Sequence, residues 1–369
     1  MAAAVMDGEL GSVLKVSAAI WMAMSYARMA AARISPGVGR LAALLPAVVL
    51  FYGIPLAFTT TAFRGCSAFF LSWLGSFKLF LLAAGQGPLD PSLPLLHFVC
   101  CASLPVKLRQ STPTANKKQL RQSTPTAKKE QLRQSTPGKA KNQDPAWAPA
   151  AKILISGAVI PFLIYAYKFK DGMSRWQLLL MTSAHFYLAM ELLLASVHAM
   201  IYGVLGMEIE PQVDRPYLAS SLRDFWGRRW NLMVPAVLRP SVYGPVRARF
   251  GKAAGVLASF LVSGIMHDLI YYYMMRRPPS GGITAFFLLH GVCAAAEAWW
   301  AQQAGWWRPP RVAAVPLTLA FVGGTGFWLF IPAMWMDGLH ELVLQDFEGM
   351  VMLMEQAGRW LAGPVLSTR

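Results

Sequence analysis

Charged residues are scarce in this sequence, and acidic ones are scarcer than basic ones. Only 14% of its 369 residues are charged, whereas a soluble domain carries about a quarter. Hydrophobic residues make up 55% of the chain, and its mean hydropathy is +0.41. Because this apolar sequence lies in long uninterrupted runs, an ordinary soluble domain is excluded, and we expect one membrane domain over residues 1–369.

Cysteine is also rare, and its spacing matches no metal site or redox motif. The four cysteines, none of them in a CxxC pair, are Cys66, Cys100, Cys101 and Cys293. We therefore expect no bound metal and no disulfide framework. The net charge of +16 comes without a nucleic-acid motif, so nucleic acid is not an expected partner. The basic residues lie between apolar runs or in one loop, which favours topology signals and contacts with anionic lipid.

Eight apolar runs are long enough to cross a bilayer, which takes about 20 residues. They cover residues 12–32, 41–61, 67–85, 149–169, 177–204, 253–275, 283–304 and 312–336. The run 95–106 is too short and is predicted to be re-entrant or interfacial. Segment 339–362 mixes acidic and apolar residues, which predicts an amphipathic helix on the membrane surface. The expected fold is all-α, a polytopic transmembrane bundle of about eight helices.

Residues 107–143 contain a repeat in which the motif LRQSTP occurs three times. Its polar, basic composition cannot bury enough apolar surface to offset the entropy of ordering, so we expect a disordered loop. Basic residues in the wider loop 101–147 far outnumber its two acidic residues, Glu130 and Asp144, which predicts a cytosolic position. Two further spans would return residues 205–252 to the same side.

His267 is the most informative polar residue, because polar groups inside spanning helices are costly. It lies about 21 Å along a helix that begins near Ala253, well inside the hydrocarbon zone. Gly264 precedes it by three residues, so a neighbouring backbone can approach that face. A neutral imidazole there could act as a general base. A packed histidine that bonds to another helix is an equally open interpretation.

A second polar segment, SLRDFWGRRWN, covers residues 221–231. Its aromatic residues alternate with charged ones, which predicts a helix lying at the cytosolic interface rather than crossing the bilayer. Plain anchoring at the headgroups explains the same pattern. Other polar residues within predicted spans are expected to make contacts inside the bundle or to line a cavity. They are Lys78, His185 with Glu191, and His290 with Glu297.

Four blocks in this order resemble the plant wax synthase branch of the membrane-bound O-acyltransferase superfamily. They are FKLFLLAAGQGPL (77–89), SLRDFWGRRWNLMV (221–234), LVSGIMHDLIYYY (261–273) and FFLLHGVCAAAE (286–297). The resemblance implies a long-chain-alcohol O-fatty-acyltransferase of the endoplasmic reticulum. Such an enzyme makes a wax ester from acyl-CoA, its co-substrate, and a fatty alcohol, without a cofactor. The repeat at 107–143 departs from the family pattern, as does Gly227.

The resemblance also implies which residues form the site. His267 matches the family's catalytic histidine, and Asn231 matches its upstream polar partner, which would hold substrate or donate to the oxyanion. Asp268 points about 100° away from His267 on a helix and is expected to face another helix or a polar cavity. Since no Ser or Cys elbow is present, direct transfer is expected rather than an acyl-enzyme. Substrate binding is expected of Asp224, Trp226, Arg228, Arg229, Trp230, Asp268 and His290.

Two alternatives remain. A sterol O-acyltransferase would share the mechanism and differ in the shape of its acceptor cavity. A transporter would use intramembrane His, Glu and Lys as an ion path. It is less favoured, because the hydrophobic segments show no two-fold repeat and the charges do not follow one helix. Acyl-chain length and oligomeric state are not determined by the sequence.

Overall fold

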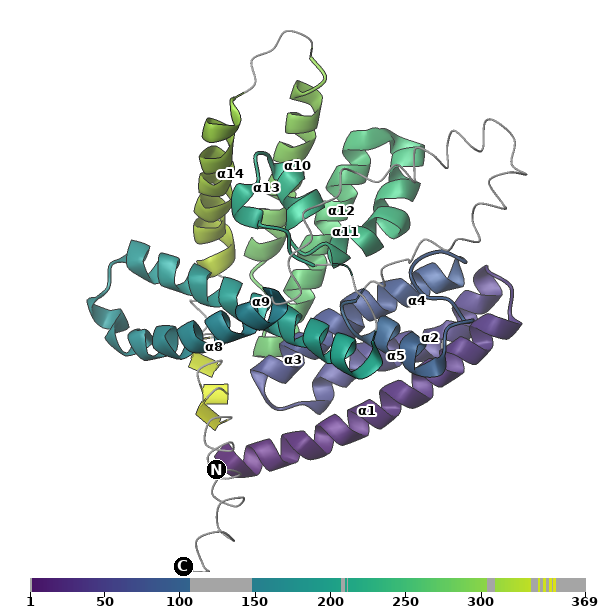
Figure 1. Cartoon of the computed structure of the whole chain (residues 1–369). Helices are drawn as coiled ribbons and strands as arrows, with labels where there is room; N and C mark the ends of the chain where they lie inside the picture. Colours follow the sequence, from purple (N-terminus) through teal and green to yellow (C-terminus); the bar gives the residue numbers. More distant parts are fainter. Residues whose placement is uncertain are drawn as a thin grey trace, which may run out of the picture. The chain divides into compact units, whose positions relative to one another are not determined.

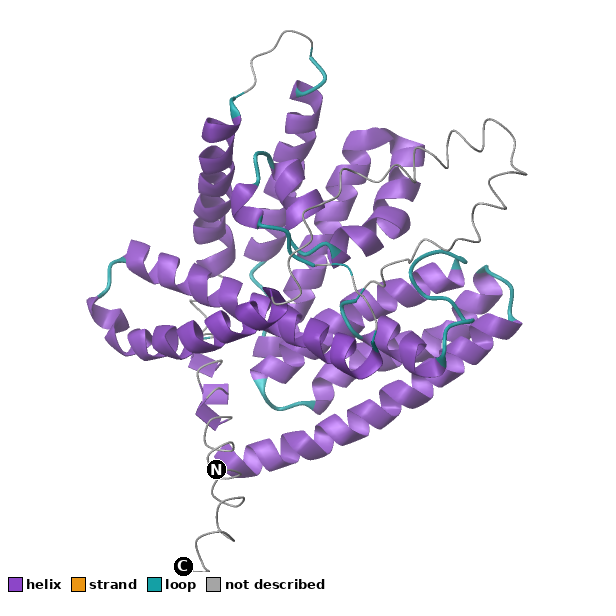
Figure 2. Cartoon of the chain, in the orientation of Figure 1, coloured by secondary structure: helices purple, strands orange, loops and turns teal. Residues whose placement is uncertain are grey.

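The computed structural model describes residues 2–106, 148–206, 212–303 and 309–332, with residue 210 and scattered positions within 338–349. Across these ranges the chain forms helices and loops and contains no strand (Figure 2). The loop predicted at 107–143 and most of the surface helix predicted at 339–362 lie outside the described residues. The prediction of an all-α membrane protein is confirmed.

The eight predicted spans all coincide with helices long and apolar enough to cross a membrane. These helices are α1 (Ala2–Arg33), α2 (Val38–Gly53) with η1 (Ile54–Ala57), α3 (Thr61–Ser67) with η2 (Ala68–Gly75) and α4 (Ser76–Ala83), α8 (Ala148–Ala166) with η3 (Tyr167–Gly172), α9 (Arg175–Leu205), α12 (Gly244–Met275), α13 (Gly282–Trp300), and α14 (Arg311–Thr325) with η7 (Gly326–Phe330). The short run forms α5 (Leu95–Ser103), whose 9 residues cannot span a bilayer.

The described helices divide into two compact units. The smaller unit contains α8 and most of α9, which form a helical hairpin (Figure 1). Within it Lys152 pairs with Glu191 over 3.2 Å, and Nδ1 of His185 lies 3.4 Å from the Tyr167 hydroxyl. The polar residues of this hairpin thus make contacts inside the unit. Because α9 contributes to both units, the division leaves the single domain over residues 1–369 a prediction.

The larger unit contains a continuous helix formed by α3, η2 and α4, the most buried of the spans. The Ser72 hydroxyl of η2 donates to the Phe51 carbonyl of α2 over 2.9 Å. Lys78 of α4 is fully buried, and its ammonium donates to the carbonyls of Cys101 (2.7 Å) and Leu104 (2.6 Å). The cation donates to the Cys101 carbonyl at the end of α5 and adds a second bond to the Leu104 carbonyl, which also accepts from the Val106 N–H. Of the two predicted roles for Lys78, the structure therefore assigns the contact within the bundle.

Helices α12 and α13 pack closely through glycine. A Cβ on Gly264 would lie 2.9 Å from the Thr284 Cα, and one on Gly291 would lie 2.9 Å from the Phe260 Cβ. The predicted close approach at Gly264 is thereby confirmed, with α13 as the neighbour. Helix α12 is interrupted at Gly251, where φ is 88°. The straight part that carries His267 therefore begins near the predicted start.

The segment between α9 and α12 consists of short turns. They are η4 (Pro216–Leu218), α10 (Leu222–Asp224), η5 (Phe225–Arg229), α11 (Met233–Leu238) and η6 (Arg239–Tyr243). The prediction of one helix over 221–231 is therefore wrong in its extent, because the helix ends before Trp230, which is extended. Gly227, a weak helix former, lies in the wide turn η5. Asn231 then adopts a positive φ of 41°, which ends any helical continuation.

Candidate active site

His267 has one ring nitrogen bonded and one free. Its Nδ1 lies 2.7 Å from the Ser263 carbonyl oxygen, one turn earlier on α12. Because a carbonyl can only accept, Nδ1 carries the hydrogen and donates it. In the neutral imidazole Nε2 then holds the lone pair, and no residue in the described ranges bonds to it. This is the tautomer and orientation that a general base requires.

Aromatic rings from three elements surround the His267 imidazole. Phe287 of α13 stacks on it with centroids 4.4 Å apart and planes 26° apart. Trp73 of η2 meets it edge-on at 4.9 Å and 74°, and Phe330 of η7 lies at 6.3 Å. Packed rings restrict rotation of the imidazole and keep water away from it, which strengthens electrostatic interactions nearby.

Asn231 contributes an unsatisfied buried oxygen. Its backbone lies in the left-handed region, which Asn tolerates better than most residues. Its Oδ1 is buried and has no hydrogen-bond partner within the described ranges. The adjacent Leu232 N–H donates to the Gln212 carbonyl over 2.8 Å, and the buried Gln212 amide is likewise unpartnered on both atoms. Buried polar atoms without partners are costly and indicate a bound group or water.

A buried hydrophobic cluster connects the neighbourhoods of Asn231 and His267. Its members include Met233, two residues after Asn231, and Met266, which directly precedes His267. Trp73 belongs to the same cluster and is fully buried. The tertiary fold therefore packs Trp73 against His267 and joins it, through one cluster, to the segment that follows Asn231.

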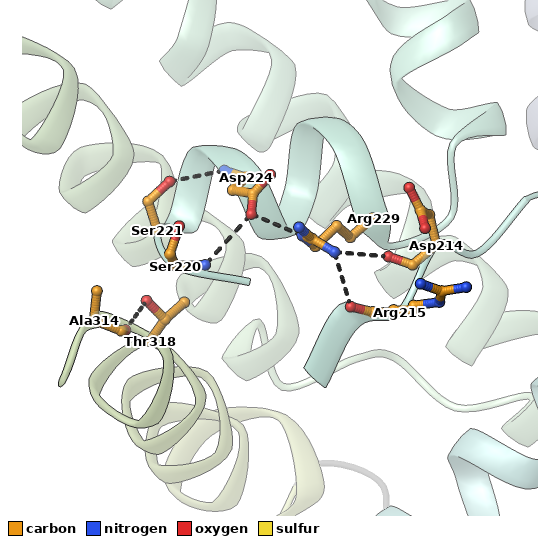
Figure 3. A network of polar contacts seen from close by, with 8 residues as sticks. All are labelled: Asp214, Arg215, Ser220, Ser221, Asp224, Arg229, Ala314 and Thr318. Atoms are coloured by element: carbon orange, nitrogen blue, oxygen red, sulfur yellow. Dashed lines mark hydrogen bonds and ion pairs between the residues drawn. The ribbon is translucent and has the colours of Figure 1, made fainter. Parts of the chain in front are cut away.

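A polar network holds the segment that leads into Asn231 (Figure 3). Arg229 Nε donates to Asp224 Oδ2 over 2.7 Å, and its Nη1 donates to the carbonyls of Asp214 (3.3 Å) and Arg215 (3.2 Å). The Asp214 N–H returns a bond to the Arg229 carbonyl over 2.8 Å. These bonds give Asp224 and Arg229 a positioning task. Their contact with substrate stays a prediction.

His290 joins three elements. The Trp226 Nε1–H of η5 donates to His290 Nδ1 over 3.0 Å, and His290 Nε2 lies 2.8 Å from the Thr325 hydroxyl of α14. Glu297 lies two turns after His290 on the same face of α13, and its carboxylate accepts from the Arg223 N–H over 3.2 Å. Between the two predicted roles of this face, these bonds favour the interhelical one.

Asp268 faces α13, as predicted. Its Oδ2 accepts from the Thr284 hydroxyl over 2.5 Å. Its Oδ1 is buried and without a partner in the described part of the chain. Asp268 therefore does not orient the His267 imidazole, whose Nδ1 bonds to the Ser263 carbonyl instead.

The two remaining predicted residues differ in exposure. Trp230 stacks on Phe225 at 5.8 Å with planes 10° apart, which packs the end of the turn. Arg228 is exposed and forms no ion pair with any described residue. Of the adjacent arginines Arg228 and Arg229, Arg228 is therefore the one available to an anionic group.

A cavity lies beside the polar network, and Ser220 and Ser221 belong to both. Its volume is about 240 Å³. It is lined by Ser220, Ser221, Leu222, Glu297, Pro309, Ala314, Leu317, Thr318 and Phe321. The Phe321 ring lies 5.1 Å from the His290 ring, so the cavity adjoins the bonds that support η5.

Metal and thiol chemistry receive no support from the described ranges. They hold no group of three His, Cys, Asp or Glu side chains that could bind a metal ion. Burial raises the pKa of the Cys101 thiol to about 11, and burial also raises the pKa of the Cys100 thiol. Both are therefore protonated at neutral pH and poor nucleophiles.

Sequence reasoning missed several residues that the fold brings to this region. They are Trp73, Gln212, Thr284 and Thr325. A tryptophan in the middle of a span, rather than at an interface, is a signal that could have identified Trp73. The others carry no local signal, because each is defined by a partner or neighbour that is distant in sequence.

Comparison with known proteins identifies the family of this chain. Residues 209–289, which include Asn231 and His267, match the membrane bound O-acyl transferase family. The chain is 39% identical to a probable long-chain-alcohol O-fatty-acyltransferase 1 of Arabidopsis thaliana over 92% of this chain and 96% of that protein. It is 39% identical to the probable enzyme 2 of the same plant, over 92% and 95%. An acyl-CoA–sterol O-acyltransferase 1 from Arabidopsis is 31% identical, over 92% and 94%.

Proposed function

Because this chain belongs to the membrane bound O-acyl transferase family, we propose that it transfers a fatty acyl group from acyl-CoA to a long-chain fatty alcohol, which yields a wax ester. It is a multi-pass membrane O-acyltransferase, and this replaces the transporter alternative. The relatives named as long-chain-alcohol O-fatty-acyltransferases support the fatty alcohol as acceptor. The free Nε2 of His267 is the observation that carries the mechanism.

In the proposed reaction His267 acts as the general base. Nε2 takes the hydroxyl proton while the alcohol oxygen attacks the thioester carbon. The intermediate collapses, the C–S bond breaks, and the thiolate of CoA takes the proton back from the imidazole. The hydrogen bond from Nδ1 to the Ser263 carbonyl stabilises the imidazolium that forms between these steps.

Asn231 is proposed to bind the reacting group. Its amide N–H can donate to the thioester oxygen as negative charge develops there, and one such donor is worth about 3 kcal/mol. The network of Asp224 and Arg229 supports this role, because it fixes the backbone on which Asn231 lies.

The exposure and packing of the remaining predicted residues suggest which part of the substrate each of them contacts. Exposed Arg228 is proposed to contact the phosphates of CoA, since a guanidinium binds phosphate with two parallel bonds. Trp226, Trp230, Asp268 and His290 are proposed to shape the walls of the substrate site. No cofactor takes part in the proposed reaction, and acyl-CoA is a co-substrate. The proposed location is the endoplasmic reticulum, because the proposed substrates are lipids and the enzyme is a multi-pass membrane protein.

Sterol esterification is the second candidate, favoured by the relative named acyl-CoA–sterol O-acyltransferase. That relative shares 31% identity, against 39% for the fatty alcohol enzymes. An alkyl chain gains about 0.8 kcal/mol per buried methylene over water but little over bilayer. The acceptor is therefore selected by the shape of the cavity and not by hydrophobicity.

Expression in a yeast strain that makes no neutral lipid esters tests this function. We would supply fatty alcohols and sterols together and profile the esters. Wax esters from the wild-type chain, lost in His267→Ala and retained in His185→Ala, are the expected result. His185 is a suitable control because it is also a histidine in a predicted span, and its Nδ1 lies 3.4 Å from the Tyr167 hydroxyl within the smaller unit. Steryl esters alone would replace the acceptor, and no ester from well-expressed protein would overturn the proposal.

A further inference from the structure

Trp73 presents a buried hydrogen-bond donor that no described residue accepts. It lies on η2, in the middle of the continuous helix Thr61–Ala83, and its side chain is fully buried. Its indole Nε1 is buried and has no hydrogen-bond partner in the described part of the chain. A buried tryptophan normally finds a partner for this N–H. An unpaired donor in such a place therefore indicates a group that binds there.

The position of Trp73 narrows what that group can be. Its ring centroid lies 4.9 Å from that of His267, and the two planes meet at 74°. The cluster of Trp73 also contains Met266, which directly precedes His267, and Met233, which lies two residues after Asn231. An indole N–H donates and never accepts, so its partner is an acceptor atom. Two acceptor atoms lie near the general base during acyl transfer, the alcohol oxygen and the acyl carbonyl oxygen, and only the carbonyl oxygen gains negative charge as the new bond forms.

The local helix geometry is also unusual. The eight residues of η2, Ala68–Gly75, form π-type turns inside a longer helix. Such turns are rare and occur frequently at functional sites, since they rotate side chains relative to a regular helix. Here the turn carries Trp73 towards the His267 ring.

We propose that Trp73 is a further catalytic residue whose indole N–H donates a hydrogen bond to the carbonyl oxygen of the acyl donor. This inference rests on the proposed acyl transfer. As the alcohol oxygen bonds to the carbonyl carbon, the C=O electron pair moves to oxygen, and Nε1–H stabilises the resulting oxyanion. His267 holds the alcohol proton during this step and returns it to the departing sulfur. Trp73 and the Asn231 amide together then supply the two donors typical of an oxyanion site.

The test removes the N–H and keeps the ring. Kinetics of the full-length purified enzyme would be compared for wild type, Trp73→Phe, and a variant with a benzothiophene isostere of the Trp73 side chain. We expect kcat to fall about 10- to 100-fold in both, with the KM for acyl-CoA within about two-fold of wild type. Trp176→Phe is the matched control, because Trp176 is largely exposed and its ring stacks on Phe327.

Two further measurements separate a catalytic from a packing role. One is the affinity for a thioether analogue of acyl-CoA, which lacks the carbonyl oxygen, and the other is the thermal unfolding midpoint. Both should stay at the wild-type values in the isostere variant. An isostere variant with wild-type kcat would overturn the proposal, as would a loss of kcat accompanied by equal losses in analogue affinity or stability. Failure of the proposed function is distinct, because the wild-type enzyme itself would then form no ester.

Discussion

The indole nitrogen of Trp226 donates to Nδ1 of His290 over 3.0 Å. Since the indole N–H cannot accept, Nδ1 must be unprotonated, and His290 Nε2–H therefore donates to the Thr325 hydroxyl. That hydroxyl in turn donates to the Phe321 carbonyl over 2.6 Å. While the imidazole is neutral, each donor and acceptor in this series of hydrogen bonds, from Trp226 to the Phe321 carbonyl, has a partner. His290 is thus a positioning residue that links η5, α13 and α14, whereas His267 keeps a free nitrogen.

This chain of bonds makes His290 and Trp226 a coupled pair. We expect His290→Ala and Trp226→Phe each to destabilise the protein by about 1–3 kcal/mol, because a buried partner is left unpaired. The double variant should lose less than the sum of the two. Thermal unfolding of the wild-type, single-variant and double-variant proteins in detergent measures these stability differences. The pH profile of any remaining activity should keep its wild-type shape, and a shifted profile would instead show that His290 takes part in proton transfer.

Asn231 allows its backbone role and its side-chain role to be separated. Asn231→Gly keeps a residue suited to a φ of 41° and removes only the amide. We expect it to fold normally and to lose activity about 100-fold. Asn231→Ala should lose activity equally and be less stable by about 1 kcal/mol, because alanine disfavours positive φ. Ester synthesis and unfolding midpoints report the two effects. Wild-type activity in the glycine variant would contradict a catalytic role for the amide.

Gly264 is predicted to be irreplaceable on packing grounds. A methyl group there would meet the Thr284 backbone at 2.9 Å, and α12 and α13 would have to separate. Gly264→Ala should therefore cost about 1–3 kcal/mol and lower activity, because Asp268 and His267 follow on the same helix. The matched control is Gly323→Ala in α14, where nothing lies within 4 Å of the added Cβ. Equal stability of the two variants in thermal unfolding would contradict this account of the interface.

Lys78 is predicted to be structural. Lys78→Met would remove the ammonium donor from the Cys101 carbonyl and leave the Leu104 carbonyl with the Val106 N–H as its donor. We expect a lower unfolding midpoint, equivalent to about 1–3 kcal/mol. The KM for acyl-CoA of the folded enzyme should stay near the wild-type value. A folded variant of normal stability with a much higher KM would show instead that the ammonium contacts substrate.

The membrane architecture was predictable because it depends on local sequence. A span needs about 20 apolar residues in succession, and hydropathy along the chain reports this directly. The same local reasoning located the start of the helix that carries His267 and the close approach at Gly264. It also predicted that Asp268 points away from His267 towards another helix or a polar cavity. Each depends only on helix periodicity or residue size. The helix predicted over 221–231 was wrong in extent, because pairing of residues 229–232 with residues 212–214 overrides local propensity.

Tertiary structure decided everything that depends on a distant partner. The sequence placed Lys78, His290 and Asp268 inside the membrane domain, but it could not tell which groups they bond. Only the fold joins Lys78 to the end of α5, His290 to Trp226 and Thr325, and Asp268 to Thr284. The contact of Trp73 with His267 is of the same kind, since the two residues are far apart in sequence. Hydropathy is a property of consecutive residues, whereas a hydrogen bond between helices exists only once they have packed.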